Sequence, residues 1–175
     1  MPEPIEITKM KENSKNREYV KSQVQIQGSL LEFACSEFRD DQEIVMEAVK
    51  NNPEAFEFAS DRLKEDREIA FESVSRVGWT YCYIKGDLLQ DKELLLAGLK
   101  VSGQILYYAE SNLRDDEDVV LEAVKNKPII IKYASLRLRE NKTIGLAAME
   151  RSKKCYEFLG ENLKQDEEIL NIKNA

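Results

Sequence analysis

The chain has 175 residues, a length that suggests about one domain, and its 33 acidic and 26 basic residues give a net charge of −7. A hydrophobic fraction of 42% excludes a fully disordered chain, and 7 Gly and 4 Pro are too few for a collagen-like or low-complexity one. The chain contains no histidine, which excludes acid–base catalysis and metal ligation by that residue, and its acidic balance argues against a protein that depends on nucleic-acid phosphates.

Residues 1–15 precede the patterned part of the chain. They carry Pro2, Pro4 and six charges of balanced sign, which predicts a mostly disordered leader. No basic start followed by an apolar core indicates a signal peptide, and no apolar run approaches the ~18 residues of a membrane span. We therefore expect a cytoplasmic protein that does not bind membranes, with delivery into a host cell left open.

From residue 16 onward the sequence repeats with a period of 25 residues. Each repeat starts with an acid or an amide, at Asn16, Asp41, Asp66, Asp91, Asp116, Asn141 and Asp166. An aromatic column contains Phe33, Phe58, Tyr83, Tyr108, Tyr133 and Phe158. No insertion breaks the register, so six repeats follow the leader (16–40, 41–65, 66–90, 91–115, 116–140 and 141–165), with a final segment at 166–175.

The first half of each repeat predicts an amphipathic helix. In residues 41–65 the carboxylate of Asp41 stands where a helix N-cap belongs. An apolar stripe with helical spacing follows at Ile44, Val45, Ala48 and Val49. This helix should end near residues 51–52, because the next column holds Pro or Gly in most copies.

The second half predicts another helix, from about residue 54 to residue 64. Phe56, Ala59 and Leu63 are spaced i, i+3 and i+7, as on one face of a helix. Lys64 should close this helix, since a cation at a helix C-terminus opposes the negative end of the dipole. The same column reads Arg39, Lys64, Leu89, Arg114, Arg139 and Lys164, and we interpret it as a dipole complement rather than a nucleic-acid groove.

Two helices of about ten residues are marginal alone and need tertiary packing. Stacking the copies would bury one continuous core, so we predict an all-α, right-handed α-solenoid of helix-turn-helix repeats, with residues 16–175 as a single domain. Lys21, Ser22 and Gln23 replace apolar or small residues of the inner copies, which fits an N-terminal cap, and the segment 166–175 should cover the last layer.

The repeat resembles the tandem helical repeats called domain of unknown function 4116, over about residues 16–170. Two copies carry the resemblance best: Glu47-Ala48-Val49 with Phe58-Ala59-Ser60, and Glu122-Ala123-Val124 with Tyr133-Ala134-Ser135. The third repeat departs most, with Gly78-Trp79 and Ile84-Lys85-Gly86-Asp87. The resemblance implies no activity, cofactor or catalytic residue.

The positions equivalent to 54, 57 and 61 predict a binding face, because they are polar in the first, second and sixth repeats but partly apolar in between. We interpret the exceptions as an apolar patch with a charged rim, which suits contact with a protein. The alternative is that these side chains fold back onto neighbouring repeats. The candidate partner-binding residues are Trp79, Cys82, Tyr107, Ile129, Lys132 and Leu136.

Acidic residues also gather at the turns between repeats, at Asp40–Asp41, Glu65–Asp66, Asp115–Asp116 and Asp118. They suggest either an edge that binds a cation or a basic partner, or helix capping with solubility, which explains their positions without a ligand. The three cysteines, Cys35, Cys82 and Cys155, form no CxxC motif, and we interpret them as small apolar residues rather than reactive thiols.

The sequence therefore favours a non-catalytic scaffold that binds a protein or peptide partner through the second-helix surface of the third to fifth repeats. It carries no P-loop, GxSxG or GxGxxG motif, and we expect no enzyme, no cofactor, no metal site and no nucleic-acid partner. One alternative is a structural spacer from a longer repeat array. A weaker one is a cation-dependent or enzymatic module that uses the acidic turns.

Overall fold

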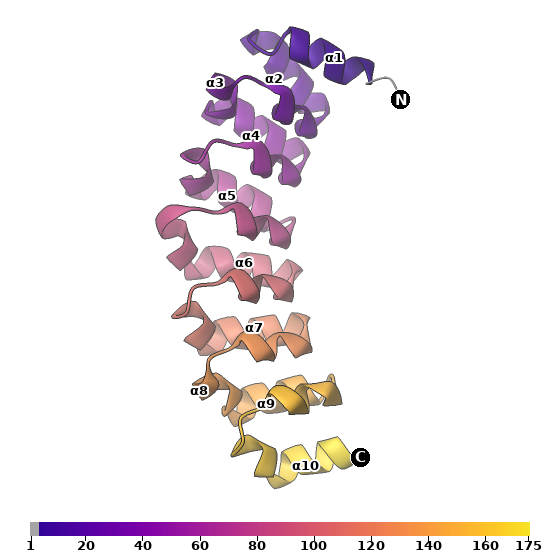
Figure 1. Cartoon of the computed structure of the whole chain (residues 1–175), viewed down its shortest axis with the longest axis vertical. Coiled ribbons are helices and arrows are strands. Elements are labelled where there is room, and N and C mark those ends of the chain that lie inside the picture. Colours follow the sequence, from indigo (N-terminus) through magenta and orange to yellow (C-terminus); the bar gives the residue numbers. More distant parts are fainter. Residues whose placement is uncertain (1–3) are drawn as a thin grey trace. The chain divides into compact units, whose positions relative to one another are not determined.

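The computed structural model describes residues 4–175, and every element within them is a helix (Figure 1). The chain divides into two compact units, Met1–Leu88 and Leu89–Ala175, called unit 1 and unit 2 below. Each unit is described by itself. The single domain over residues 16–175 and the right-handed sense of the solenoid stay predictions.

Unit 1 alternates α-helices with short 3-10 helices, labelled η. Its elements are α1 (Ile5–Glu12), α2 (Arg17–Ile26), η1 (Gly28–Phe33), α3 (Ser36–Arg39), α4 (Gln42–Asn51), η2 (Pro53–Phe58), η3 (Leu63–Glu65), α5 (Arg67–Val74) and η4 (Gly78–Tyr83). The next element, η5 (Gly86–Gln90), spans the boundary of the two units.

Unit 2 repeats the same succession. Its elements are α6 (Lys92–Val101), η6 (Gly103–Tyr108), η7 (Leu113–Asp115), α7 (Glu117–Asn126), η8 (Pro128–Tyr133), α8 (Leu136–Arg139), α9 (Lys142–Met149), η9 (Lys153–Phe158), η10 (Leu163–Gln165) and α10 (Glu167–Asn174). Helices with 25-residue repeats are therefore confirmed.

The first helix of each repeat forms as the sequence predicted. The carboxylate of Asp41 accepts hydrogen bonds from the backbone N–H groups of Glu43 and Ile44, at 3.0 and 3.1 Å, and so satisfies two of the free donors at the start of α4. Ile44 and Val45 are completely buried on the stripe that the periodicity predicted. Asp66, Asp91, Asp116, Asn141 and Asp166 cap the equivalent helices in the same way.

The second helix is different from the prediction of one continuous helix over residues 54–64. Helix η2 ends at Phe58, and Ala59 is extended, with φ −60° and ψ 153°. The reason is a bond between repeats: the backbone N–H of Ser60 donates to the carbonyl oxygen of Arg39 at 2.8 Å, so it is not available for a helix. The same bond joins Cys35 to Ser14, Ser135 to Arg114, and Gly160 to Arg139.

Within each unit the first helices of the repeats form one layer, and the six-residue 3-10 helices form a second layer beside it. In unit 1, α2 packs on α4 and α4 on α5, and in unit 2 α7 lies between α6 and α9, with α10 against α9 (Figure 1). The 3-10 helices η1 and η2 pack on each other and on α4, as η6 and η8 do on α7. The core lies between the two layers.

The column of Gly and Pro residues that ends the first helix of most repeats includes Gly28 and Gly103. These two glycines also allow the two layers to pack closely. A Cβ atom on Gly28 would lie 2.2 Å from the carbonyl oxygen of Ala48, and one on Gly103 would lie 2.6 Å from that of Ala123. The N–H of Gly28 donates to the side chain of Asn51 at 2.7 Å. A bond of the same length joins Gly103 to Asn126.

The leader is also different from the expectation. We predicted residues 1–15 to be mostly disordered, but α1 covers Ile5–Glu12 and its Met10 is completely buried. Helix α1 packs on η1, and the ammonium group of Lys11 lies 5.2 Å from the centre of the Phe33 ring. The prediction of disorder for residues 1–3, which include Pro2, lies outside the described residues. Among residues 4–175, no helix is both long and apolar enough to cross a membrane.

Candidate partner-binding surface

The positions equivalent to 54, 57 and 61 are at the surface in all six repeats. All of them are exposed except Ser29 and Ile129, which are half-buried. The candidate residues selected from the sequence therefore do not fold back into the core as a group. The most exposed apolar side chain among them is Leu136, at 68% of its full area.

Three of the six candidate residues, Tyr107, Ile129 and Lys132, line one groove of unit 2, called the Tyr107 groove below. Its volume is about 260 Å³. The other residues that line it are Gln104, Tyr108, Lys127, Ile130 and Tyr133. Tyr107 is 56% exposed and Tyr108 51%, so the groove presents aromatic surface to solvent.

The 3-10 geometry of η6 and η8 explains why these side chains meet. Residues i and i+3 are eclipsed in a 3-10 helix, so Gln104 and Tyr107 project from one side of η6. Ile129 and Lys132 project in the same way from η8, which packs beside η6. The intervening residues of both helices point into the core, where Leu106 and Ile131 are completely buried.

The aromatic rings of the groove hold one another in place. The Tyr107 ring meets the rings of Tyr108 and Tyr133 edge to face, with 5.0 Å between centroids in both pairs. The ammonium group of Lys132 lies 4.8 Å from the centre of the Tyr133 ring and 6.0 Å from that of Phe158. Such contacts fix large side chains at the surface at little cost in conformational freedom.

A second groove of about 200 Å³, called the Arg114 groove, shares Tyr133 with the Tyr107 groove. Ser111, Arg114, Tyr133, Ala134 and Ser135 line it, so Tyr133 is a wall of both grooves. The Nε atom of Arg114 is buried and has no hydrogen-bond partner within residues 4–175. Leu136 follows Ser135 directly in the chain, at the start of α8.

The sequence did not identify Tyr108, Tyr133 or Arg114 as binding residues. The sequence analysis assigns no role to the aromatic column, and it explains Arg114 as a complement to a helix dipole. The structure has only the three-residue helix η7 at Arg114, which has almost no dipole to oppose. The signal that pointed to this region was the replacement of polar residues by Tyr107, Ile129 and Leu136.

Trp79 and Cys82 belong to η4 in unit 1. Trp79 is 41% exposed, and its ring meets that of Tyr83 edge to face at 5.6 Å. Desolvation by the surroundings, with Glu57 adding to it, raises the pKa of the Cys82 thiol, so Cys82 is a poor nucleophile. The candidate residues of unit 1 and unit 2 were predicted to form one continuous patch. This stays a prediction, because Trp79 and Cys82 belong to a different unit from the other four.

Unit 1 contains a counterpart of the Arg114 groove, called the Arg39 groove, with a volume of about 470 Å³. Its frame repeats three repeats earlier, with Ser36, Arg39, Phe58, Ala59 and Ser60 in place of Ser111, Arg114, Tyr133, Ala134 and Ser135. The Nε atom of Arg39 is also buried without a hydrogen-bond partner in the described part of the chain. Glu57, Asp61 and Lys64 complete the lining in unit 1.

The same arrangement of a serine, an aspartate and an arginine, called the clamp below, stands beside each of these frames. The hydroxyl of Ser60 donates a short hydrogen bond to Asp40, and Arg62 Nε donates to the same carboxylate oxygen at 3.0 Å. Ser135, Asp115 and Arg137 repeat this arrangement in unit 2, again with 3.0 Å between the Arg Nε atom and the carboxylate. The hydroxyl of Ser60, followed by the guanidinium of Arg62, lowers the pKa of Asp40.

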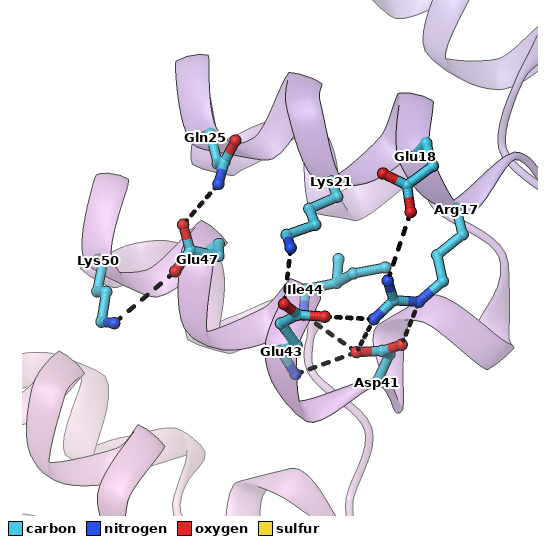
Figure 2. Close-up of polar contacts among 9 residues, drawn as sticks. All are labelled: Arg17, Glu18, Lys21, Gln25, Asp41, Glu43, Ile44, Glu47 and Lys50. Carbon is cyan, nitrogen blue, oxygen red and sulfur yellow. Dashed lines mark hydrogen bonds and ion pairs between the residues drawn. The ribbon is translucent and has the colours of Figure 1, made fainter.

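The acidic turns are occupied by the protein's own donors. Figure 2 shows the first of them: Arg17 bonds Asp41 at 3.1 Å and Glu43 at 2.5 Å, while Lys21 bonds Glu43 at 2.6 Å. The hydrogen bonds from Arg17 and Lys21 lower the pKa of Glu43 to about 2. In unit 2, Lys92 joins Asp116 and Asp118 in the same manner.

Capping and clamping between repeats therefore account for the acidic columns. Among the described residues, no group of three or more Cys, Asp and Glu side chains is placed to hold a metal ion.

The match of this chain to a known protein family has the same 25-residue period as its repeats. A family model described as Domain of unknown function (DUF4116) matches five overlapping stretches, residues 16–64, 41–89, 66–114, 91–139 and 116–164. Consecutive stretches start one 25-residue repeat apart, in the register read from the sequence. No curated protein and no solved structure matches the chain.

Proposed function

The chain belongs to the family of the domain of unknown function DUF4116, as its repeats predicted, and on this premise we propose that it is a non-catalytic scaffold for a protein or peptide partner. The partner binds a face in the third to fifth repeats. This face consists of the residues equivalent to positions 54, 57 and 61 of the second repeat. The Tyr107 groove and the Arg114 groove of unit 2 are the centre of this face.

One observation carries the proposal: large side chains are exposed beside a groove instead of being buried. Tyr107, Tyr108 and Leu136 each have more than half of their area in solvent. Tyrosine supplies much contact area for little loss of conformational freedom, so it is enriched where interfaces gain most of their binding energy. The structure of the repeat does not require these residues, because Glu32, Glu57 and Glu157 occupy the position of Tyr107 in other copies.

A spacer in a longer array is the second candidate, and the clamps between repeats favour it. Within each unit, neighbouring copies are joined by a backbone bond, such as Ser60 to Arg39, and ion pairs such as Lys142 with Asp166 at 2.9 Å add to it. Bonds between nearest neighbours are what a repeat array needs for its stability. A spacer, however, has no use for the exposed tyrosines.

The test is affinity purification followed by mass spectrometry with three forms of the chain. The wild type is compared with the Tyr107→Ser/Leu136→Ser variant and with a control, Glu157→Ser/Glu161→Ser, which changes exposed residues of the sixth repeat. We expect the same proteins to be captured by the wild type and the control and to be lost with the Tyr107→Ser/Leu136→Ser variant. Capture that is equal for all three forms contradicts the proposal and favours the spacer.

A further inference from the structure

We infer that the segment bound by unit 2 is an extended acidic peptide, with an apolar side chain in the Tyr107 groove and carboxylates on both sides of Tyr133. This inference rests on the proposed function and adds the chemical class of the partner. It follows from the charges around the two grooves, from an unpartnered guanidinium, and from a comparison with unit 1.

The cations of the two grooves have no acidic partners in the protein. Lys127 and Lys132 line the Tyr107 groove and Arg114 lines the other, and none of the residues that line either groove is acidic. None of these three cations forms an ion pair within residues 4–175. A basic groove in a chain of net charge −7 stands out from its surroundings and attracts acidic segments.

Three other basic residues of unit 2, Lys92, Arg137 and Lys142, form ion pairs with carboxylates of a neighbouring repeat. Lys92 bonds Asp116 and Asp118, at 2.9 and 2.8 Å, and Lys142 bonds Asp166 at 2.9 Å. Carboxylates are plentiful in the sequence, so the repeat can supply one where a cation needs it. The grooves around Tyr133 lack one, which leaves the pairing to a ligand.

The guanidinium of Arg114 is the strongest indication of a carboxylate. Its Nε–H is buried without an acceptor, and a buried donor without a partner is costly. Arg114 lines the groove, and the planar fork of arginine binds a carboxylate through two parallel hydrogen bonds. In the sixth repeat, where Leu159 and Gly160 replace the Ala-Ser pair, the equivalent Nε of Arg139 bonds the carbonyl oxygen of Phe158.

The arrangement of the two grooves suits an extended segment. Tyr133 lines both of them, so a ligand that lies against this ring can reach both. Side chains of an extended chain alternate in direction, and neighbours on one side are about 7 Å apart. An apolar side chain of the peptide can therefore contact Tyr107 and Ile129, and a carboxylate further along the peptide can bind Arg114. A carboxylate on the other side of the peptide can bind Lys132.

Unit 1 provides a natural negative control. Its Arg39 groove has the same frame, but Glu54, Glu57 and Asp61 stand where unit 2 has Ile129, Lys132 and Leu136. These carboxylates repel an acidic segment and offer no apolar contact. The same fold therefore presents the proposed chemistry in unit 2, whereas in unit 1 the carboxylates of Glu57 and Asp61 stand beside the cations Arg39 and Lys64 of the groove.

The test is selection of peptides from a phage-displayed library of random 12-residue sequences on the immobilised full chain, followed by titration of the synthetic peptides. We expect the selected peptides to be acidic with at least one apolar residue. Their affinity should fall about tenfold or more with Lys132→Glu and with Arg114→Met, and stay unchanged with the matched control Arg39→Met. Lys132→Gln, which keeps the length of the side chain, gives an intermediate loss.

The outcomes separate the inference from the proposed function. Selected peptides that are neutral or basic, and that lose affinity with Tyr107→Ser, overturn the acidic partner but keep the binding face. A library that yields no peptide sensitive to Tyr107→Ser overturns both. Thermal unfolding of each variant shows that it is folded, and if Arg114→Met unfolds, Arg114→Lys, which keeps the charge but not the fork, replaces it with the same expected loss.

Discussion

The Arg39 groove of unit 1 and the Arg114 groove of unit 2 have one frame and two different rims. The frame consists of a serine, an arginine, an aromatic ring and an Ala-Ser pair held by an aspartate clamp. The rim at positions 54, 57 and 61 is acidic in unit 1, whereas in unit 2 the equivalent residues are Ile129, Lys132 and Leu136. The frame is shared by the two units and the rim differs between them, so our proposal assigns recognition of a partner to the rim.

The largest effect is expected from the shared core beneath the two grooves. Phe56 in η2 and Ile131 in η8 occupy equivalent positions and are completely buried. Phe56→Ala should destabilise the protein by about 3–5 kcal/mol and Ile131→Ala by about 2–5 kcal/mol, because each leaves a cavity. Urea unfolding measures both. If only one of the two variants lost stability, the frames of the two units would not be equivalent.

The glycines of the frame come next. In Gly28→Ala and Gly103→Ala the new Cβ would lie 2.2 and 2.6 Å from backbone oxygens, which cannot move without shifting a helix. We expect each to destabilise the protein by about 1–3 kcal/mol. Gly160→Ala is the comparison, because the nearest atoms to its new Cβ belong to the side chain of Glu140, which can move if it gives up its hydrogen bond from the N–H of Leu163. Equal losses at all three glycines would contradict this account.

Acid should weaken the two clamps alike. Hydrogen bonds from Ser60 and Arg62 lower the pKa of Asp40, and the hydroxyl of Ser135 lowers that of Asp115, both from an ordinary 3.8. A carboxylate whose pKa is lower in the folded state adds stability above its unfolded pKa, and this stability is lost as the pH falls.

The clamps can be compared through their dependence on pH. We expect Asp40→Asn and Asp115→Asn to be less stable than the wild type at pH 7, and the difference to shrink as the pH falls from about 4 toward 2.5. The melting temperature followed across this range measures it. A difference that stays constant down to pH 2.5 would show that these carboxylates do not gain stability from their partners.

The smallest effects on stability are expected at the rims. Lys132→Gln removes the contact with the Tyr133 ring and should cost about 0.5–1 kcal/mol. Glu54→Gln, at another rim position of unit 1, should change stability by less than about 0.5 kcal/mol, because exposed residues without such contacts matter little. Chemical unfolding compares the two. A loss above about 2 kcal/mol at either position would show that the rim is part of the frame.

The sequence predicted what depends on one repeat and missed what depends on two. Asp41 and the stripe from Ile44 to Val49 are local signals, so the first helix was predicted correctly. The extended Ala59 was not, because its cause is the bond from Ser60 to Arg39 in the preceding repeat. The same holds for α1, whose Met10 is buried against a helix that follows it in the chain.

The candidate site shows the same division. Exposure at positions 57 and 61 could be predicted from polar residues in most copies, and Tyr107 and Leu136 are indeed exposed. The walls of the grooves could not be, because Tyr133 and Arg114 belong to columns that look like packing and capping in a single repeat. Their role depends on how η6, η7 and η8 come together.

The most direct test gives unit 2 the rim of unit 1. A peptide selected on the wild-type chain is titrated calorimetrically into the Ile129→Glu/Lys132→Glu/Leu136→Asp variant, whose melting temperature shows that it is folded. Our account predicts that binding is lost while the fold is kept. Binding with the affinity of the wild type would contradict it, because the rim would then not be the surface that recognises the partner.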